Sequence, residues 1–181
     1  MRRFGYVMVT YFMVMGTAIG SFVDFPTKLI WNASASTPIG LYSIAPAGRF
    51  EVTDLVAVRA PEPFAAFMVE RGYIGRGVPL MKRVAGVPGQ QVCRRDHAIT
   101  VDGVPMGDAL DRDHVGRPLP TWQGCRRIAE GELFLMNWSV PDSLDGRYFG
   151  PLPTSDVIGR ATPVWTDEYG DGRYVWHAPT R

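Results

Sequence analysis

The longest uncharged stretch of the chain lies at its start. Residues 4–23 contain no Asp, Glu, Lys or Arg, and Arg2 and Arg3 precede them. A helix of about 20 residues is about 30 Å long, which matches the hydrocarbon core of a bilayer. Positive residues before such a segment favour a cytoplasmic start and export of the rest. The small-x-small sequence at residues 18–20 also fits a cleaved signal peptide. We therefore expect an anchor or a signal over residues 1–25 and an exported domain over residues 26–181.

Beyond this segment, apolar residues occur in short runs that turn residues separate. A longer apolar run at residues 78–92 is broken by a turn at residues 87–89. We expect one short helix over residues 61–71 and a polar loop over residues 107–123. The pattern predicts a mainly β, antiparallel, partly closed barrel. Its other expected strands cover residues 29–31, 40–44, 55–59, 98–101, 104–106, 132–138 and 156–165, with a hairpin turn at Asp102 and Gly103.

The charged residues are balanced in number but uneven in kind. There are 19 basic and 18 acidic residues, which gives no reason to expect nucleic acid as a partner. Only two of the basic residues are lysines, Lys28 and Lys82. Lysine can serve as a base once its pKa is lowered, whereas arginine stays protonated. Lys82 lies in an apolar run, where burial would lower its pKa. The alternative is that its side chain turns out to water beside Arg83.

The two cysteines, Cys93 and Cys125, fit an exported chain. An even cysteine count in that compartment suggests a disulfide. Two buried free thiols are the alternative. Two cysteines without a nearby pair of histidines do not suggest zinc, and the chain has no glycine-rich phosphate loop. We therefore expect no metal and no cofactor.

Two serines lie close together in the stretch NASASTPIG, residues 32–40. A nucleophilic serine needs a base to take its proton and donors for the oxyanion. Ser36 could attack while its own N–H and the hydroxyl of Ser34 face the oxyanion. Pro38 and Gly40 would then fix the turn. Taken alone, such a stretch is more typical of a solvated linker.

After the membrane-length segment, four stretches follow in order: SASTPIGLY at 34–42, DLVAV at 54–58, MKRVAGVPG at 81–89 and SLDGRYFG at 143–150. Together they resemble the boxes of the type I signal peptidase family, the Ser-Lys membrane endopeptidases. The end of the first stretch, the serine box, resembles the TraF branch, the signal-peptidase-like proteins of plasmid conjugation. The resemblance extends from the N-terminal segment to about residue 150, and its boxes are specific only in combination.

The resemblance implies a role for each matching residue. Ser36 would be the nucleophile, Lys82 the general base, and Ser34 the side-chain donor to the oxyanion. Ser143 would orient the lysine. Asp145 and Arg147 would form a buried ion pair that supports the same corner of the site.

Some positions depart from the family pattern. Thr37 stands where many members have methionine, Thr53 where glycine is frequent, and Gln90 where an acidic residue is frequent. Pro38 comes one residue sooner than in housekeeping signal peptidases, which leaves open which serine attacks. None of these departures removes a catalytic group.

The resemblance also implies a substrate and a location. The chain would be a serine endopeptidase that processes, and possibly cyclises, a membrane-inserted conjugative pilin precursor. It would act at the periplasmic face of the bacterial inner membrane, in contact with the lipid bilayer, or in the periplasm if its first segment is cleaved. The substrate would lie extended along a strand edge. A general leader peptidase and a non-catalytic, membrane-tethered scaffold of a secretion channel are the alternatives.

Overall fold

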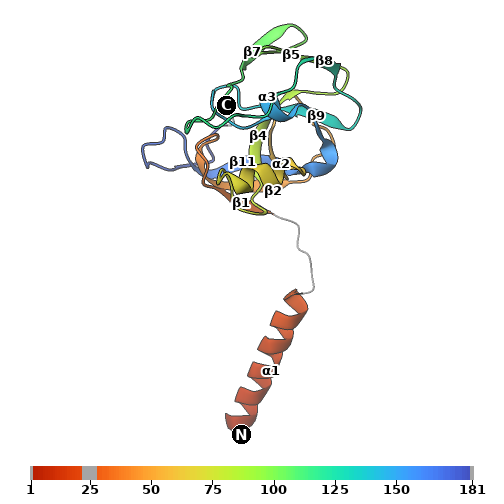
Figure 1. Cartoon of the computed structure of the whole chain (residues 1–181). Helices are drawn as coiled ribbons and strands as arrows, with labels where there is room; N and C mark the ends of the chain where they lie inside the picture. Colours follow the sequence, from red (N-terminus) through yellow and green to blue (C-terminus); the bar gives the residue numbers. More distant parts are fainter. Residues whose placement is uncertain (1, 22–27, 180–181) are drawn as a thin grey trace.

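A computed structural model describes residues 2–21 and 28–179 of the chain. Helix α1 spans Arg2–Ser21 and is exposed along its described length (Figure 1). By length and composition it could cross a membrane, and a signal sequence would pass the same test. The expected helix is therefore confirmed. Residues 22 and 23 of the uncharged run, and the expected boundary between residues 25 and 26, lie outside the described residues.

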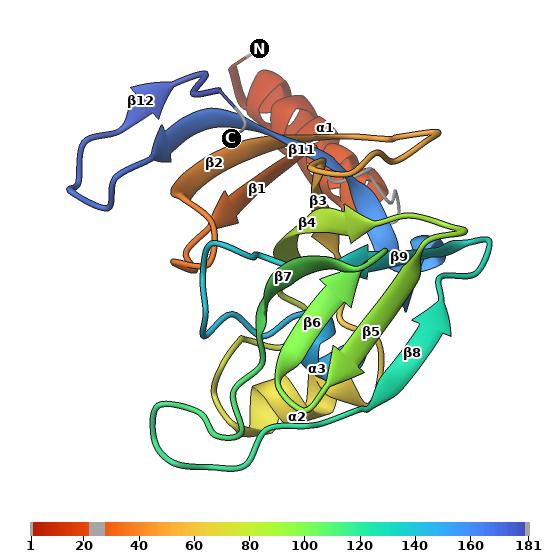
Figure 2. The ribbon, with the colours of Figure 1, turned by 90° about the horizontal axis from the view of Figure 1, so that it is seen from above.

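Most strands belong to one antiparallel sheet that curls into an open half-barrel (Figure 2). Its strand order is β1-β2-β11-β3-β4-β9-β10, and β12 pairs with β11. The mainly β, partly closed architecture expected from the short apolar runs and the turn residues between them is confirmed. The strands are β1 Leu29–Asn32, β2 Ile39–Ala45, β3 Leu55–Val58, β4 Leu80–Gly86, β9 Glu132–Leu135, β10 Leu152–Pro153, β11 Val157–Asp167 and β12 Val175–Trp176.

A second antiparallel sheet has the order β7-β6-β5-β8. The turn between β6 and β7 has positive φ at both Asp102 (48°) and Gly103 (80°), as a tight hairpin of this kind requires. The expected hairpin is therefore confirmed. The strands are β5 Gln91–Arg95, β6 Ala98–Val101, β7 Val104–Asp108 and β8 Gly124–Arg127.

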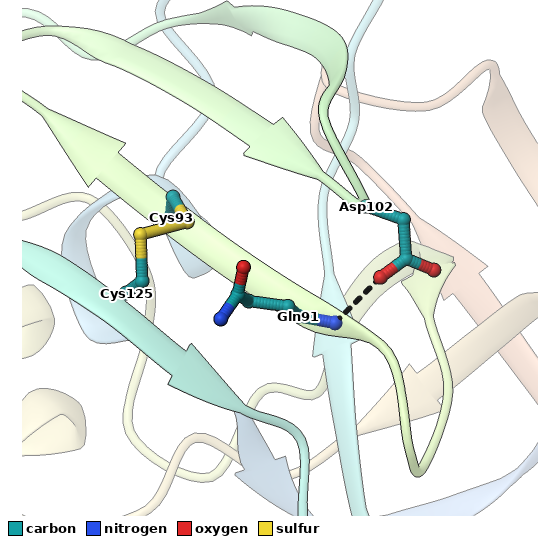
Figure 3. The surroundings of a disulfide bond; sticks show 4 residues. All are labelled: Gln91, Cys93, Asp102 and Cys125. Carbon is teal, nitrogen blue, oxygen red and sulfur yellow. Dashed lines mark hydrogen bonds between the residues drawn. A yellow bond between two sulfur atoms is a disulfide. The ribbon is translucent and has the colours of Figure 1, made fainter.

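A disulfide joins the two cysteines across this second sheet. Cys93 of β5 and Cys125 of β8 are directly paired in the strand register, and their sulfur atoms are bonded (Figure 3). Close by, the backbone N–H of Gln91 donates to the Asp102 carboxylate at 2.8 Å. The expected bridge is present, and the alternative of two free thiols is not.

Strand β4 connects the hydrophobic clusters of the molecule. Leu80 and Val84 pack in a cluster with α2 and β9, Met81 packs with β2 and β3, and Ala85 packs with the second sheet. Six of the seven β4 residues are buried, and Arg83 is the exception. The conformation of β4 is therefore fixed from several sides, and with it the position of Lys82.

The sequence pattern missed several short elements. Helix α2, Phe64–Glu70, is shorter than the expected helix over residues 61–71. Strand β9 ends at Leu135, whereas a strand to residue 138 was expected. Strand β8 is exposed at every position, so it has no alternation to detect and depends on pairing with β5. Also unforeseen were strands β10 and β12, the 3₁₀ turn η1 Thr154–Asp156, and helix α3 Gly146–Phe149.

Two backbone positions explain local sequence choices. A Cβ on Gly40 would lie 2.2 Å from the Trp165 carbonyl oxygen, so only glycine allows β2 to approach β11 this closely. Thr53 has φ of 83°, which is uncommon for a β-branched residue. A glycine would adopt that φ without steric cost.

Candidate active site

Asn32, at the end of β1, shapes the loop that carries the two serines. Its side-chain amide donates to the carbonyl oxygens of Ser34, Thr37 and Pro38 at 2.9, 3.0 and 3.1 Å. Its Oδ1 accepts the backbone N–H of Ser34 at 3.2 Å, which is an Asx turn. Asn32 is buried, so these bonds are shielded from water. The loop is therefore a fixed turn rather than a solvated linker.

The two serine side chains face each other in this turn. Ser34 Oγ lies 3.0 Å from Ser36 Oγ, and the Ser36 backbone N–H donates to Ser34 Oγ at 3.3 Å. A hydroxyl and a backbone N–H thus lie together beside a second hydroxyl. Two adjacent donors of this kind are what an oxyanion hole requires.

Lys82 is buried, with 4% of its surface exposed. Its Nζ donates to Ser143 Oγ at 2.7 Å. Burial lowers the pKa of Lys82 to about 8. The negative charge of Asp145 acts to raise this pKa, and the positive charge of Arg147 has a smaller, lowering effect. The alternative that this side chain turns out to water is therefore wrong. With this pKa, the neutral amine that a general base needs is far more populated at neutral pH than for an exposed lysine.

A buried ion pair supports the segment that carries Ser143. Arg147 donates to Asp145 from Nη2 at 2.8 Å and from Nε at 2.9 Å, and both side chains are almost fully buried. Arg147 also donates to the carbonyl oxygens of Val140, Pro141 and Ser143. A charged pair is retained in a core only when its remaining donors are satisfied, as they are here. The ion pair therefore fixes the loop behind Lys82.

Asn137 connects the serine loop to β4 and was not singled out from the sequence. Its Nδ2 donates to the carbonyl oxygens of Ser36 at 2.8 Å and Met81 at 3.0 Å. Its Oδ1 accepts the Arg83 backbone N–H at 3.2 Å, and its own backbone N–H donates to Asp145. Nothing near Asn137 in the sequence signals this role. For Asn32, the Asx-turn tendency of asparagine before a Ser-x-Ser stretch was an available signal.

The serine loop, β4 and the loop before α3 enclose a common space, here named the first cleft. It has a volume of about 660 Å³ and is lined by Ser34, Ser36, Lys82 and Ser143, with mainly apolar walls that include Ile74 and Leu80. In the described part of the chain, no direct hydrogen bond joins Ser36 to Lys82. Catalytic hydrogen bonds of free enzymes are often long and tighten when substrate binds.

These groups define what the first cleft can do chemically. It offers hydroxyl nucleophiles, an amine of lowered pKa, and a backbone N–H beside a hydroxyl. Within residues 2–21 and 28–179, no three His, Cys, Asp or Glu side chains gather as a metal site would require. The chemistry available from the described side chains is acyl transfer through a serine.

Comparison with known proteins gives matches over most of the chain. The family described as "Signal peptidase, peptidase S26" matches residues 1–166, which include every residue of the site described above. "Conjugal transfer protein TraF" of Agrobacterium fabrum is 37% identical over 147 residues, covering 75% of this chain and 81% of that protein. "Plasmid transfer protein TraF" of Escherichia coli is 30% identical over 160 residues, covering 83% of each. A crystal structure of a signal peptidase I from Enterococcus faecalis aligns with a TM-score of 0.38 and 21% identity, covering 64% of this chain and 98% of that one.

Proposed function

We propose, from the premise that this chain belongs to the signal peptidase family, peptidase S26, that it is a membrane-associated endopeptidase using a Ser36–Lys82 dyad. The observation that carries the proposal is the state of Lys82. Its side chain is buried and hydrogen-bonded to Ser143, and burial lowers its pKa to about 8. It also lines the same cleft as Ser36. A fold tolerates a desolvated lysine mainly where a neutral amine is useful.

The mechanism assigns one role to each group. Ser36 Oγ attacks the scissile carbonyl carbon while its proton moves to Lys82 Nζ. The oxyanion of the tetrahedral intermediate accepts hydrogen bonds from the Ser36 N–H and the Ser34 hydroxyl. Lys82 then gives the proton to the departing amine, and an acyl-enzyme remains on Ser36. A second nucleophile, water or an amine, repeats the transfer and frees the serine.

We propose a membrane-inserted pilin precursor of a conjugation system as the substrate. Support comes from the relatives: the two proteins at 37% and 30% identity are named conjugal and plasmid transfer proteins. The "Probable signal peptidase I-1" of Synechocystis is 28% identical over 61% of this chain, so a general leader peptidase is the second candidate. An amine as the second nucleophile would cyclise the pilin, and water would leave it linear.

Co-expression with candidate pilin precursors, followed by intact mass measurement, tests this function. A product with the mass of the linear cleaved chain shows hydrolysis. A product one water lighter than that linear chain shows cyclisation. Ser36→Ala and Lys82→Arg should each abolish processing, because arginine keeps the charge and cannot serve as the base. Lys28→Arg, a change at the exposed second lysine, is the matched control and should process normally.

The two serines are distinguished in the same assay. Ser34→Ala should slow processing by about 10² or more, because one oxyanion donor is lost. If Ser34→Ala is inactive while Ser36→Ala is active, the two roles are exchanged. Substantial processing by Lys82→Arg would exclude Lys82 as the base.

A further inference from the structure

A second cleft also reaches Ser36. It has a volume of about 530 Å³, and we define it by Ser36, Arg83, Asn137, Trp138, Glu168 and Tyr169. Ser36 is thus shared by both clefts. An extended peptide with its scissile carbonyl at Ser36 would continue into one cleft on each side of that bond.

The two basic residues in the middle of β4 are divided between the clefts. Successive side chains of a strand point to opposite faces of the sheet. Accordingly, Lys82 lines the first cleft and Arg83 lines the second. The mechanism uses Lys82 and gives no role to the guanidinium of Arg83.

The guanidinium of Arg83 has donors to spare. It is half-buried, and among the described residues its side chain has one hydrogen-bond acceptor, the Thr53 carbonyl at 3.1 Å. Burial lowers the pKa of Arg83, while Tyr42 and Glu168 favour its charged form. A partly desolvated guanidinium binds a carboxylate more strongly than one in bulk water does.

The acidic side chains of the second cleft do not use these donors. Asp167 is buried, and its carboxylate accepts the backbone N–H groups of Asp171 and Gly172. Glu168 accepts the Thr166 hydroxyl at 2.5 Å. Neither forms an ion pair with Arg83 in the described part of the chain. Glu168 still adds a negative charge that an incoming carboxylate must approach.

We propose that the second cleft binds the substrate segment after the scissile bond and that Arg83 selects a carboxylate in that segment. The proposal rests on the proposed function of the first cleft. The first cleft, with its apolar walls, holds the acyl part through both chemical steps. The second cleft, where the guanidinium of Arg83 has donors available, holds the part that leaves. The carboxylate is either an acidic side chain or the terminal carboxylate of a short tail, because both offer the same oxygen pair to a guanidinium.

The test measures binding and cleavage separately. Three fluorescent peptides share alanine and serine residues around a central bond. One has Glu at the second position after that bond and an amidated end, one has Gln there and a free carboxyl end, and one has Gln and an amidated end. Their affinities are measured by anisotropy on full-length, detergent-solubilised Ser36→Ala protein, and their cleavage on the unmodified protein.

We expect one of the two carboxylate peptides to bind about tenfold more tightly than the neutral peptide. A tenfold gain in affinity is about what one hydrogen bond to a charged group contributes. The better of the two identifies the source of the carboxylate. Arg83→Gln should abolish the preference. Glu168→Gln, a change outside β4, should increase it about threefold because a repelling charge is removed. Arg127→Gln in exposed strand β8 is the matched control and should keep the preference.

Equal affinities for the three peptides, a preference that survives Arg83→Gln, or a preference weakened by Glu168→Gln would each overturn the inference. Failure of the proposed function gives a different result, because the unmodified protein would then cleave none of the peptides whatever their affinities.

Discussion

At the scale of single residues, Lys82 shows how the fold lowers the pKa of a buried amine. Its ammonium loses solvation on β4, and a single hydroxyl, that of Ser143, accepts its hydrogen bond. Burial is the largest cause of the lowered pKa, and the nearby Asp145 charge offsets only part of it. Arg147 neutralises much of the field of Asp145 by pairing with it directly. The lysine is therefore left closer to neutral than it would be beside an unpaired carboxylate.

The pH dependence of activity follows from this pKa. If the neutral amine is the base, kcat/KM should rise with pH through a midpoint near 8. A pH–rate profile with a peptide that spans the cleavage site checks this. An activity that is flat from about pH 5 to about pH 10, or that falls through neutrality, would identify some other group as the base.

The same pKa predicts a stability effect with a definite sign. The folded pKa of Lys82, about 8, lies below the ordinary lysine value of 10.5 that applies to the unfolded chain. Between these two values the unfolded state binds more protons, so the free energy of unfolding should rise with pH in that window. Denaturant unfolding of the wild type and of Lys82→Met isolates this contribution, because methionine has no proton to bind. An identical pH dependence in both proteins would contradict it.

Asn137 carries a second prediction at this scale. Asn137→Ala would leave the carbonyl oxygens of Ser36 and Met81 without this donor in a part-buried setting. The Met81 carbonyl keeps the Thr37 hydroxyl as a donor, so the Ser36 carbonyl is the group left unsatisfied. An unsatisfied buried group costs about 1–3 kcal/mol, and unfolding should become easier by about that amount. Because the Ser36 loop would also loosen, kcat should fall more than KM rises. Asn32→Ala should have a similar effect, whereas a loss of stability with unchanged kcat would make Asn137 purely structural.

At the scale of elements, strand β8 depends on its partner more than on its own sequence. All four of its residues are exposed. It is held by the ladder with β5, by the bridge between Cys93 and Cys125, and by polar contacts of its two arginine side chains with Glu132 and the Gly89 carbonyl. An edge strand without buried side chains gains little from the hydrophobic effect. The bridge therefore adds a covalent constraint to a strand that is otherwise held by its ladder and by polar contacts.

Removal of the bridge gives the prediction for this element. The double variant with serine at both cysteines should lose about 3–4 kcal/mol of stability on the chain-entropy account of a bridge between residues 32 positions apart. Denaturant unfolding measures the loss, and amide exchange should accelerate first in β8 and β5. Both thiols of the unmodified protein should resist alkylation until it is reduced. Ready alkylation of the exported, non-reduced protein would contradict the bridge.

At the scale of the whole molecule, helix α1 limits where the site can act. It ends at Ser21, and Ser34 follows 13 residues later. Even a fully extended connection of that length reaches only about 45 Å. If α1 crosses the bilayer, the first cleft stays near its surface, where a membrane-inserted precursor presents its ends.

Retention of α1 is the prediction at this scale. The protein should remain with the membrane after an alkaline wash, and its intact mass should include residues 1–20. A chain without α1 should still cleave short peptides, but it should process a membrane-inserted precursor much more slowly because the tether is lost. A mature protein that begins after Gly20 and is released as soluble material would establish the cleaved signal instead.

The sequence by itself determined what depends on local pattern and on residue type. The uncharged run predicts α1, the apolar runs between turn residues predict the long strands, and Asp102 with Gly103 predicts the hairpin, because each depends on neighbours along the chain. The family was indicated by the order of its boxes along the chain: the serine box, the apolar run that holds Lys82, and the box at residues 143–150. The same boxes identified the candidate residues.

Only the tertiary structure decided how these residues are held. Asn137 bonds to carbonyls about 56 and 101 positions away, and no local pattern encodes such a partner. Strand β8 has no buried face, so only its pairing with β5 makes it a strand. The side chains of Lys82 and Arg83 line different clefts because they point to opposite faces of β4, and they differ in burial because the packing around β4 covers Lys82 more completely. The lowered pKa of Lys82 follows from that packing, because desolvation depends on the atoms that surround the amine in space and not on its neighbours in the sequence.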